Sequence, residues 1–238
     1  MIELQREGDV FVLTMTDGEN RWNTSFVRAF AEALDEVEAS VGPASLLTTS
    51  SSEKFFSNGL DLEWVSSSGE HRGGGRSVFG AEFMALMGRI ITLPIPTVAA
   101  VNGHAFGAGF TTALCHDVRM MRADRGFLCA NEMQLGMVIP RPELALFRHK
   151  LPAHVFFETV QLARRWSGAE ALAAGIVSST ATAEELLVVA RKRATELAPL
   201  GVNRRAFGAQ NESIFGKNSA LNEPHGAAHM LKNGPHFH

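Results

Sequence analysis

The chain has few of the features that mark disulfide-stabilised or membrane-spanning proteins. Its 238 residues include only two cysteines, Cys115 and Cys129, and neither lies in a CxxC or a Cys/His metal-binding pattern. Both lie in apolar segments, so we expect buried, reduced thiols and no cysteine-based metal site. No apolar stretch reaches the ~18 residues that indicate a membrane-spanning helix. We therefore expect neither a disulfide framework nor a membrane anchor.

An excess of positive charge and targeting signals are also missing. The formal net charge of -3 at pH 7 favours no general attraction to nucleic acid or to acidic membranes. The start, MIELQREGDV, lacks the basic residues and apolar core of a secretory signal. The end, KNGPHFH, is not a peroxisomal tripeptide of the Ser-Lys-Leu kind. We expect a cytoplasmic protein that binds neither nucleic acid nor membrane.

What the chain does have is the composition of an ordinary globular protein, with 45% hydrophobic and 20% charged residues. Short β-rich segments at Asp9–Thr16, Ser45–Ser50 and Pro96–Val101 predict strands. Apolar residues at helical spacing predict a helix that starts at Asn23 or the residue after it. Helical patterns dominate from Arg141 onward. Strands that alternate with helices and then give way to helices predict one α/β core with a helical C-terminal part.

A first glycine-containing segment is FFSNGLDL, Phe55–Leu62, which reads as the end of a strand running into Asn58-Gly59. Glycine lets the next backbone N–H approach a ligand, or adopt a conformation closed to other residues. An ordinary turn before a helix capped by Asp61 explains the same residues. Taken alone, the segment favours the ordinary turn.

A second glycine-containing segment is VNGHAFGAGF, Val101–Phe110, which predicts a buried strand, a turn and the start of a helix. Unpaired N–H groups at a helix N-terminus form a natural anion site. The spacing is neither GxGxxG nor a P-loop, so a nucleotide-phosphate site is not indicated. A lone histidine in a turn is usually structural, and we interpret His104 in that way.

The third segment is CANEMQLGMVIP, Cys129–Pro140, which is apolar except for Asn131, Glu132 and Gln134. A carboxylate among apolar residues is either exposed to solvent or buried because it has a function. We expect an apolar wall that raises the pKa of Glu132. The residues expected to form this wall are Met133, Leu135, Met137 and Val138.

Other carboxylates compete with Glu132 for a catalytic role. Asp117 starts a predicted strand and is expected to be a structural hydrogen-bond acceptor, and Glu82 lies on a Phe/Met-rich helix that leaves its direction open. Pro142-Glu143 is interpreted as a helix start with a carboxylate favourable in the first turn. The alternative is that Glu143 serves as a second acid near the site. The late pair His225 and His229 is only a weak metal-binding pattern.

In their order and spacing these segments resemble the crotonase (enoyl-CoA hydratase/isomerase) family. The resemblance extends over most of the first 177 residues. It implies an α/β fold in which residues 1–177 form a spiral of β–β–α units with the active site. Residues 178–238 are expected to form a helical trimerisation region, so that the protein is a homotrimer or a dimer of trimers. The matching segments are WN, KFFSNGLDL, PTVAAVNGHAFGAGF, CHDVRMMR, FLCANEMQLGMVIP and SGAEALAAGIV.

The resemblance also implies a site that stabilises a thioester enolate with two backbone N–H groups. On this sequence they belong to Leu60 and Ala108. A fixed donor of this kind is worth ~2.7–4 kcal/mol to charge that develops in the transition state. Coenzyme A is expected as part of an acyl-CoA substrate, with no separate cofactor and no metal. The residues expected to bind it are Lys54, Asn58, Gly59 and Gly107.

The reaction implied is that of a Δ3,Δ2-enoyl-CoA isomerase in fatty acid β-oxidation. Family hydratases use two glutamates, and here Thr111 stands in place of the first while Glu132 matches the second. A threonine does not exchange protons near neutral pH. One carboxylate suffices to move a proton from C2 to C4 of a 3-enoyl thioester. The continuation IPRPELALFR, which lacks the hydratases' glycine-rich helix start, also favours an isomerase.

Two alternatives stay open, because a fold does not fix a reaction. One is another crotonase-type reaction, such as hydration, thioester hydrolysis or decarboxylation. The other is an inactive acyl-CoA-binding paralogue in which Glu132 is structural. The second is disfavoured because an unpaired buried carboxylate is costly without a functional gain.

Overall fold

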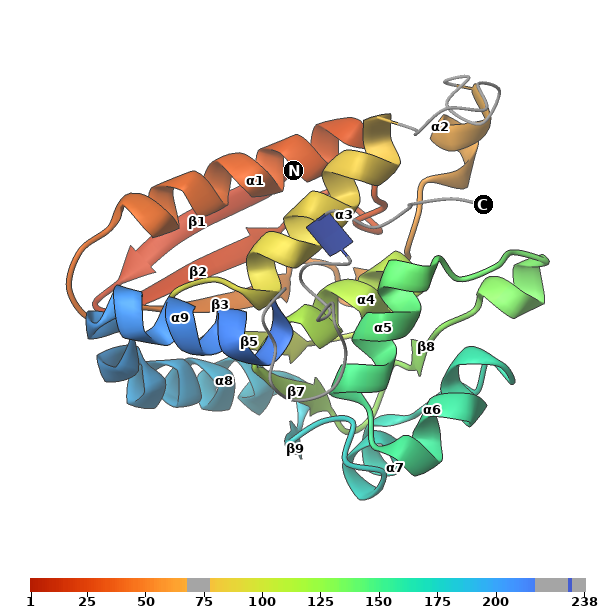
Figure 1. Cartoon of the computed structure of the whole chain (residues 1–238). Coiled ribbons are helices and arrows are strands. Elements are labelled where there is room, and N and C mark those ends of the chain that lie inside the picture. The colour runs from red at the N-terminus through yellow and green to blue at the C-terminus, as the bar shows by residue number, and fades with distance from the viewer. Residues whose placement is uncertain (68–77, 217–230, 233–238) are drawn as a thin grey trace.

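A six-stranded sheet forms the centre of the fold (Figure 1). The computed structural model describes residues 1–67, 78–216 and 231–232. The strand order is β1-β2-β3-β5-β7-β9, in which β1 and β2 pair antiparallel and every later pair is parallel. The strands are β1 (Ile2–Glu7), β2 (Val10–Met15), β3 (Ser45–Ser50), β5 (Thr97–Val101), β7 (Val118–Arg122) and β9 (Ser179–Ala181).

A second, smaller sheet has three short parallel strands, β4 (Phe55–Ser57), β6 (His104–Phe106) and β8 (Leu128–Cys129). Each is the continuation of a strand of the main sheet, so that β3 leads to β4, β5 to β6 and β7 to β8. A helix follows each pair of strands. The result is the spiral of β–β–α units that the sequence predicts.

The carboxyl ends of the small sheet's strands meet at one edge, because all three strands are parallel. Asn58 and Gly59 follow β4, Gly107 follows β6, and Glu132 lies three residues after β8. The three segments that the sequence singles out are therefore brought together by this sheet.

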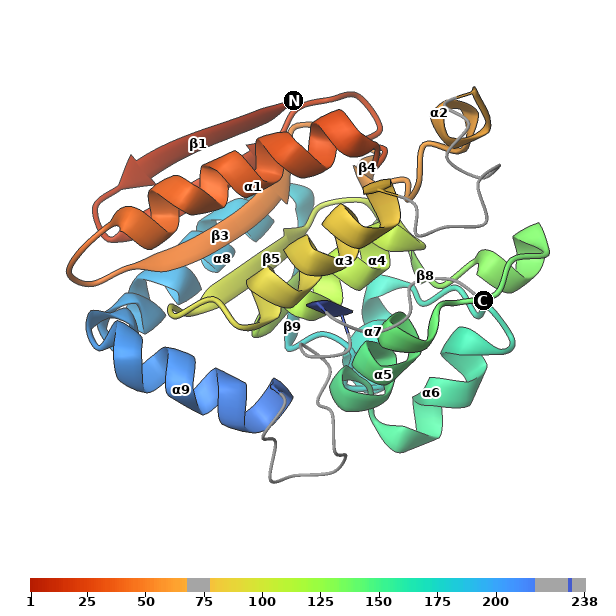
Figure 2. The ribbon, with the colours of Figure 1, turned by 45° about the horizontal axis from the view of Figure 1, so that its top comes forward.

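Helices cover both faces of the main sheet, with α1 (Thr24–Ala39) and α3 (Val78–Ile91) on one face and α8 (Ala183–Leu197) on the other (Figure 2). Alternate residues of β2 serve the two faces. Phe11 and Leu13 join the larger core cluster, whereas Val10 and Val12 pack in a separate cluster with α8. The remaining helices are α2 (Leu62–Ser67), α4 (Ala108–Cys115), α5 (Arg141–Lys150), α6 (Ala153–Val160), α7 (Gly168–Ala173), α9 (Arg204–Phe215) and the short 3-10 helices η1 (Glu132–Leu135) and η2 (Ala198–Val202).

The longer helices and strands lie where the sequence predicts them. The differences between prediction and structure concern the short elements. β6 lies within a segment that we expected to be a turn, and β1 and β9 were not expected. Strands of three residues, such as β6, are too short to show a periodic pattern, and they form because distant strands pair with them. The segment AEALAAGIV predicts a helix that stops at Gly175, and the helix observed there, α7, ends at Ala173. The composition of SSSGEHRGGGRS, residues 66–77, predicts a loop. Ser66 and Ser67 instead end α2, and the rest of this segment lies outside the described residues.

Trp22 and Asn23 join α1 to the rest of the core. The indole of Trp22 is fully buried, and its ring centroid lies 4.9 Å from that of Phe26 and 5.2 Å from that of Phe83 on α3. Asn23 caps α1, because its Oδ1 accepts a hydrogen bond from the N–H of Phe26 at 2.9 Å. The WN pair therefore fixes both the start of α1 and its packing on α3.

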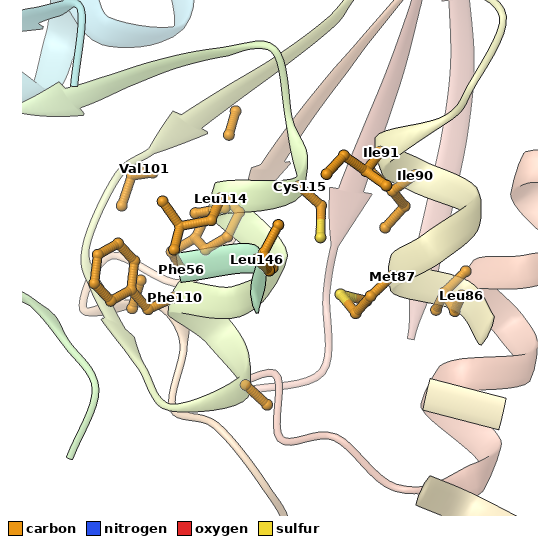
Figure 3. Close-up of a cluster of buried hydrophobic side chains, with 14 of the residues drawn as sticks. Phe56, Leu86, Met87, Ile90, Ile91, Val101, Phe110, Leu114, Cys115 and Leu146 are labelled. Atoms are coloured by element: carbon orange, nitrogen blue, oxygen red, sulfur yellow. The ribbon is translucent and has the colours of Figure 1, made fainter. Parts of the chain in front are cut away.

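The contact between α3 and α4 forms another part of the core (Figure 3). Met87 and Ile90 of α3 face Cys115 of α4, and Phe110 and Leu114 fill the space toward β5. Burial raises the pKa of the Cys115 thiol to about 12. Both cysteines are buried free thiols, as the sequence predicts.

The expectations on membrane-spanning helices and metal sites can be compared only with the described part of the chain. Within residues 1–67, 78–216 and 231–232, every helix is too short or too polar to cross a bilayer. The same described residues contain no cluster of His, Cys, Asp and Glu that could hold a metal ion. The pair His225 and His229 lies outside them. The division at residue 177 stays a prediction, although β9 joins the main sheet and α8 packs on it.

We predict that Phe30→Ala lowers the free energy of unfolding by about 3–5 kcal/mol, because it removes a fully buried ring that packs on Trp22. Urea unfolding followed by circular dichroism at one protein concentration measures the change. The control is Val41→Ala, whose side chain is 83% exposed and which should change stability by less than about 0.5 kcal/mol. Equal effects of the two substitutions would contradict this description of the core.

Candidate active site

Gly59 allows the loop after β4 to approach the loop after β6. Its φ is +81°, and a Cβ added at this position would lie 2.8 Å from the carbonyl oxygen of Phe106 and 3.8 Å from the nitrogen of Ala108. Any side chain here would be strained and would collide with backbone. The glycine therefore brings the peptide after it close to the start of α4.

Two backbone N–H groups are free at this point, those of Leu60 and Ala108. The strand-like contact with Trp22 holds the loop, since the N–H of Trp22 donates to the carbonyl of Gly59 and the N–H of Asp61 donates to the carbonyl of Trp22, both at 2.9 Å. Ala108 is the first residue of α4, where helical geometry leaves N–H groups unpaired. Among the described residues, neither N–H donates to a protein acceptor. The structure thus brings together the two donors that the sequence suggested.

Glu132 is half-buried and lies against the start of α4. A Cβ added at Gly107 would lie 3.0 Å from its Oε1, so only glycine leaves room for the carboxylate there. Its Oε2 is buried and has no hydrogen-bond partner among the described residues. Burial raises the pKa of Glu132, and a hydrogen bond from its own backbone N–H opposes that shift in part.

The predicted apolar wall around Glu132 is wrong in its composition. Met133, Leu135 and Val138 are exposed, Val138 to 76%. The reason is local geometry, because η1 makes a single 3-10 turn that ends at Gly136 in a left-handed conformation. Glu132 at its start points inward, while the apolar side chains that follow point outward. The pKa of Glu132 is raised by burial of its carboxyl group, which does not depend on those exposed side chains.

A second carboxylate, that of Glu143, reaches the same helix one turn further on. Thr111 is fully buried, and its hydroxyl donates to Oε2 of Glu143 at 2.8 Å. Glu143 lies in the first turn of α5, as expected, but it is only 7% exposed, so a simple helix start does not account for it. Burial and the negative charge of Glu132 raise the pKa of Glu143 to about 8, against the effect of the Thr111 hydrogen bond.

The other carboxylates considered have structural hydrogen-bond partners of their own. Glu82 accepts two hydrogen bonds from Arg28, at 2.8 and 2.9 Å, in an ion pair on the surface between α3 and α1. Asp117 accepts from the N–H and the hydroxyl of Thr97, which confirms its structural role. Asp61 caps α2 by accepting from the N–H of Trp64.

His104 has the structural surroundings that we expected. Its ring stacks on that of Phe127 at 5.6 Å between centroids, and Phe55 and Phe106 also contact it. Burial, and secondly the positive charge of Lys54, lower its pKa. A neutral ring of this kind in an aromatic cluster packs rather than exchanges protons.

Of the side chains predicted to bind coenzyme A, that of Lys54 is exposed and that of Asn58 is hydrogen-bonded within the protein. Lys54 is exposed, with its ammonium 5.0 Å from the centroid of the Phe55 ring. Asn58 donates through its side-chain amide to Oε2 of Glu19 at 2.8 Å, and its N–H donates to the Glu19 carbonyl. Asn58 therefore stabilises the loop after β4. Contact of either residue with coenzyme A stays a prediction.

The sequence did not predict the contact between Thr111 and Glu143. Both positions depart from the hydratase pattern, which was the available signal. They are separated by 32 residues, and no rule of spacing joins a helix after β6 to another helix after β8. The pairing depends on how α4 and α5 pack, which includes a perpendicular contact of the Phe110 and Phe147 rings at 5.4 Å.

Comparison with known proteins gives relatives over most of the chain. It is 36% identical over 201 residues to enoyl-CoA delta isomerase 2, peroxisomal, of Arabidopsis thaliana, covering 82% of this chain and 84% of that protein. It is 32% identical over 219 residues to enoyl-CoA delta isomerase 3 of the same plant, covering 90% and 92%.

Solved structures show the same fold. An enoyl-CoA isomerase of Mycobacterium tuberculosis aligns with a TM-score of 0.80 and 23% identity over 98% of this chain and 95% of that one. An enoyl-CoA hydratase/isomerase family protein of Pseudomonas syringae aligns with a TM-score of 0.83 and 24% identity over 98% and 94%. The family model for enoyl-CoA hydratase/isomerase matches residues 5–222. With this match and the crotonase fold of β–β–α units, the chain belongs to the enoyl-CoA hydratase/isomerase family.

Proposed function

We propose that this protein is an acyl-CoA isomerase that moves the double bond of a 3-enoyl-CoA to position 2. The observation that carries the proposal is the placement of the half-buried Glu132, whose Oε2 is buried and has no hydrogen-bond partner among the described residues, beside the helix start that offers the Ala108 N–H. Relatives named enoyl-CoA delta isomerases, at 32–36% identity, support it. An isomerisation of this kind needs one base and one anion site, and we assign these roles to Glu132 and to the N–H groups of Leu60 and Ala108.

In the proposed reaction, Glu132 takes a proton from C2 of the 3-enoyl thioester. The electron pair of that C–H bond moves toward the carbonyl, and the N–H groups of Leu60 and Ala108 hold the resulting negative oxygen. The same carboxyl group then returns its proton to C4 as the double bond forms between C2 and C3. A raised pKa suits both steps, because it strengthens the carboxylate as a base and leaves the acid able to donate near neutral pH.

Coenzyme A would bind as part of the substrate, so that no separate cofactor takes part. Lys54 is exposed and available for a phosphate, whereas Gly59 and Gly107 contribute through their backbone paths. We propose the homotrimer, or dimer of trimers, on the family resemblance. A cytoplasmic location stays a prediction, and the first of the plant relatives is named peroxisomal.

We predict that Glu132→Gln lowers kcat for isomerisation of trans-3-hexenoyl-CoA by about 10²–10⁴-fold, since the amide cannot exchange the proton. Formation of the conjugated 2-enoyl product is followed by absorbance. Glu82→Gln is the matched control, because Glu82 lies in a surface ion pair and its loss should leave kcat within a fewfold. A Glu132→Gln enzyme that keeps kcat within a fewfold of wild type would exclude this mechanism.

We predict that Gly59→Ala lowers kcat by about 10²–10³-fold, because the added Cβ meets the Phe106 carbonyl and displaces the Leu60 N–H. Gly18→Ala is the control for backbone strain, since Gly18 also has a positive φ, +57°, but nothing within 4 Å of an added Cβ. Steady-state kinetics of both variants are compared with their thermal stability. If the two variants lose activity to the same extent, the loss reflects strain and not the donor.

We predict that kcat/KM for isomerisation rises with pH through an apparent pKa above the ordinary glutamate value of 4.5. The sign follows from the mechanism, because the free enzyme needs Glu132 ionised and burial raises its pKa. A pH–rate profile measured with 3-enoyl-CoA tests it. A limb at or below pH 4.5 would show that the active base is an ordinary, solvated carboxylate.

A further inference from the structure

One face of the small sheet is aromatic and only half-buried. Residues of β6 alternate between the two faces, so that Ala105 is fully buried in the main core while His104 and Phe106 are half-buried on the other face. Phe127, directly before β8, is also half-buried, and its ring stacks on that of His104 at 5.6 Å between centroids. The ring of Phe106 lies 5.0 Å from that of His104. The β6–β8 half of this face therefore offers three neighbouring rings to solvent.

Two exposed arginines beside these rings have no acidic partner among the described residues. The guanidinium carbon of Arg165 lies 5.7 Å from the centroid of the Phe106 ring. Arg125 lies two residues before Phe127 in the chain. The positive charges of both arginines act on His104. Guanidinium groups that gather at one face without a counter-charge are suited to hold an anion.

The neighbouring arginines differ, because they are paired within the protein. Arg122 donates to both carboxylate oxygens of Asp124, at 2.9 and 2.7 Å. Arg164 forms ion pairs with two glutamates. The acids closest in sequence to Arg125 and Arg165 are therefore already engaged by other cations.

Packing alone does not account for a histidine among these rings. Nδ1 of His104 is buried and has no hydrogen-bond partner among the described residues, which is costly for a polar atom. An apolar ring would avoid that cost. Burial first, and then the positive charges of Lys54, Arg125 and Arg165, lower the pKa of His104, so that the ring is mainly neutral at pH 7. A bound anion would offset these charges.

We propose that the β6–β8 half of this sheet face is a binding site for a nucleoside phosphate. The base stacks on the rings of His104 and Phe127, and the phosphate pairs with the guanidinium groups of Arg125 and Arg165. Every base has a flat face that can stack on an aromatic side chain. A guanidinium group offers two parallel donors to phosphate oxygens. The ligand therefore needs both a flat ring and a negatively charged phosphate.

The rings that take the base are separated from the candidate active site along the strands. His104 begins β6 and Phe127 precedes β8, whereas Gly107 and Glu132 follow those strands. Binding to this face does not require the proposed isomerisation. Coenzyme A also contains a nucleotide, so a free nucleotide and the substrate share this chemistry. The proposed ligand is the free nucleotide, and the experiment distinguishes the two sources.

Isothermal titration calorimetry of the full chain with AMP tests the site. We expect saturable binding that weakens as salt is added. Arg165→Gln and Arg125→Gln should each raise the Kd by about 10-fold or more, because each removes charge-assisted hydrogen bonds to the phosphate. Phe127→Leu keeps an apolar side chain but loses the ring, and it should raise the Kd by about fivefold or more.

The matched control is Arg205→Gln, which removes one exposed arginine at the start of α9. It changes the net charge as the other two arginine substitutions do, and it should leave the Kd for AMP within about twofold, because salt screens a distant charge. All three arginine variants should keep kcat for isomerisation within a fewfold. An equal loss of AMP binding in Arg205→Gln would show a general charge effect and overturn the proposal.

Three further ligands separate the parts of the proposed interaction. Adenosine and inorganic phosphate, each lacking one part, should bind at least about 10-fold more weakly than AMP. Phosphate that binds as tightly as AMP would show an anion site without a place for the base. Coenzyme A should leave AMP binding unchanged. Displacement of AMP by coenzyme A would show that the face belongs to the substrate site, and would overturn the proposal.

The protonation of His104 gives a readout that a surface charge elsewhere would not move. The pKa of His104 is measured from its ring proton signals by NMR, with the His104→Phe variant used to assign them. We expect AMP to raise this pKa, because the phosphate offsets the charges of Arg125 and Arg165. The rise should be smaller in Arg165→Gln. Absence of saturable AMP binding, or a pKa that AMP does not change, would overturn the proposal whether or not the protein isomerises 3-enoyl-CoA.

Discussion

The close approach of two backbone segments, with the Gly59 Cα facing the Phe106 carbonyl, is the constraint on which the rest of the site depends. A Cβ at Gly59 would lie 2.8 Å from that oxygen, which leaves no room for a side chain. The approach is fixed by the parallel pairing of β4 with β6 and by the contact of Leu60 with Trp22. Two N–H groups from distant parts of the chain therefore lie close together without side-chain chemistry.

The small sheet and α4 also position the carboxyl groups of Glu132 and Glu143. β8 extends the small sheet and places Glu132 against Gly107, so that its carboxylate lies beside the residue that precedes Ala108. Helix α5 then packs on α4 and adds Glu143 next to Thr111. Removing the Glu143 carboxyl group and Oε2 of Glu132 from water is costly for folding. Active sites typically bear such a folding cost, because their chemistry depends on carboxyl groups with shifted pKa values.

Much of the fold could be predicted from the sequence, because long elements carry periodic patterns. The strands at residues 9–16, 45–50 and 96–101 and the helix capped by Asn23 were predicted within a few residues. Short elements such as β6 and β9 were missed, since their residues take strand geometry only when a distant strand pairs with them. The direction of Met133, Leu135 and Val138 was wrong, because a single 3-10 turn gives no repeating pattern from which to infer a face.

The sequence by itself determined the family resemblance, the three segments of the site and the residue types available in them. Glu132, Gly59 and Gly107 were identified in this way, because their neighbours along the chain set their context. Tertiary structure alone decided that Oε2 of Glu132 is buried without a hydrogen-bond partner among the described residues, and that the charge of Glu132 acts on Glu143. The physical reason is that burial and charge interaction depend on distances through space, and α4 and α5 bring Thr111 and Glu143 to 2.8 Å across 32 residues of chain.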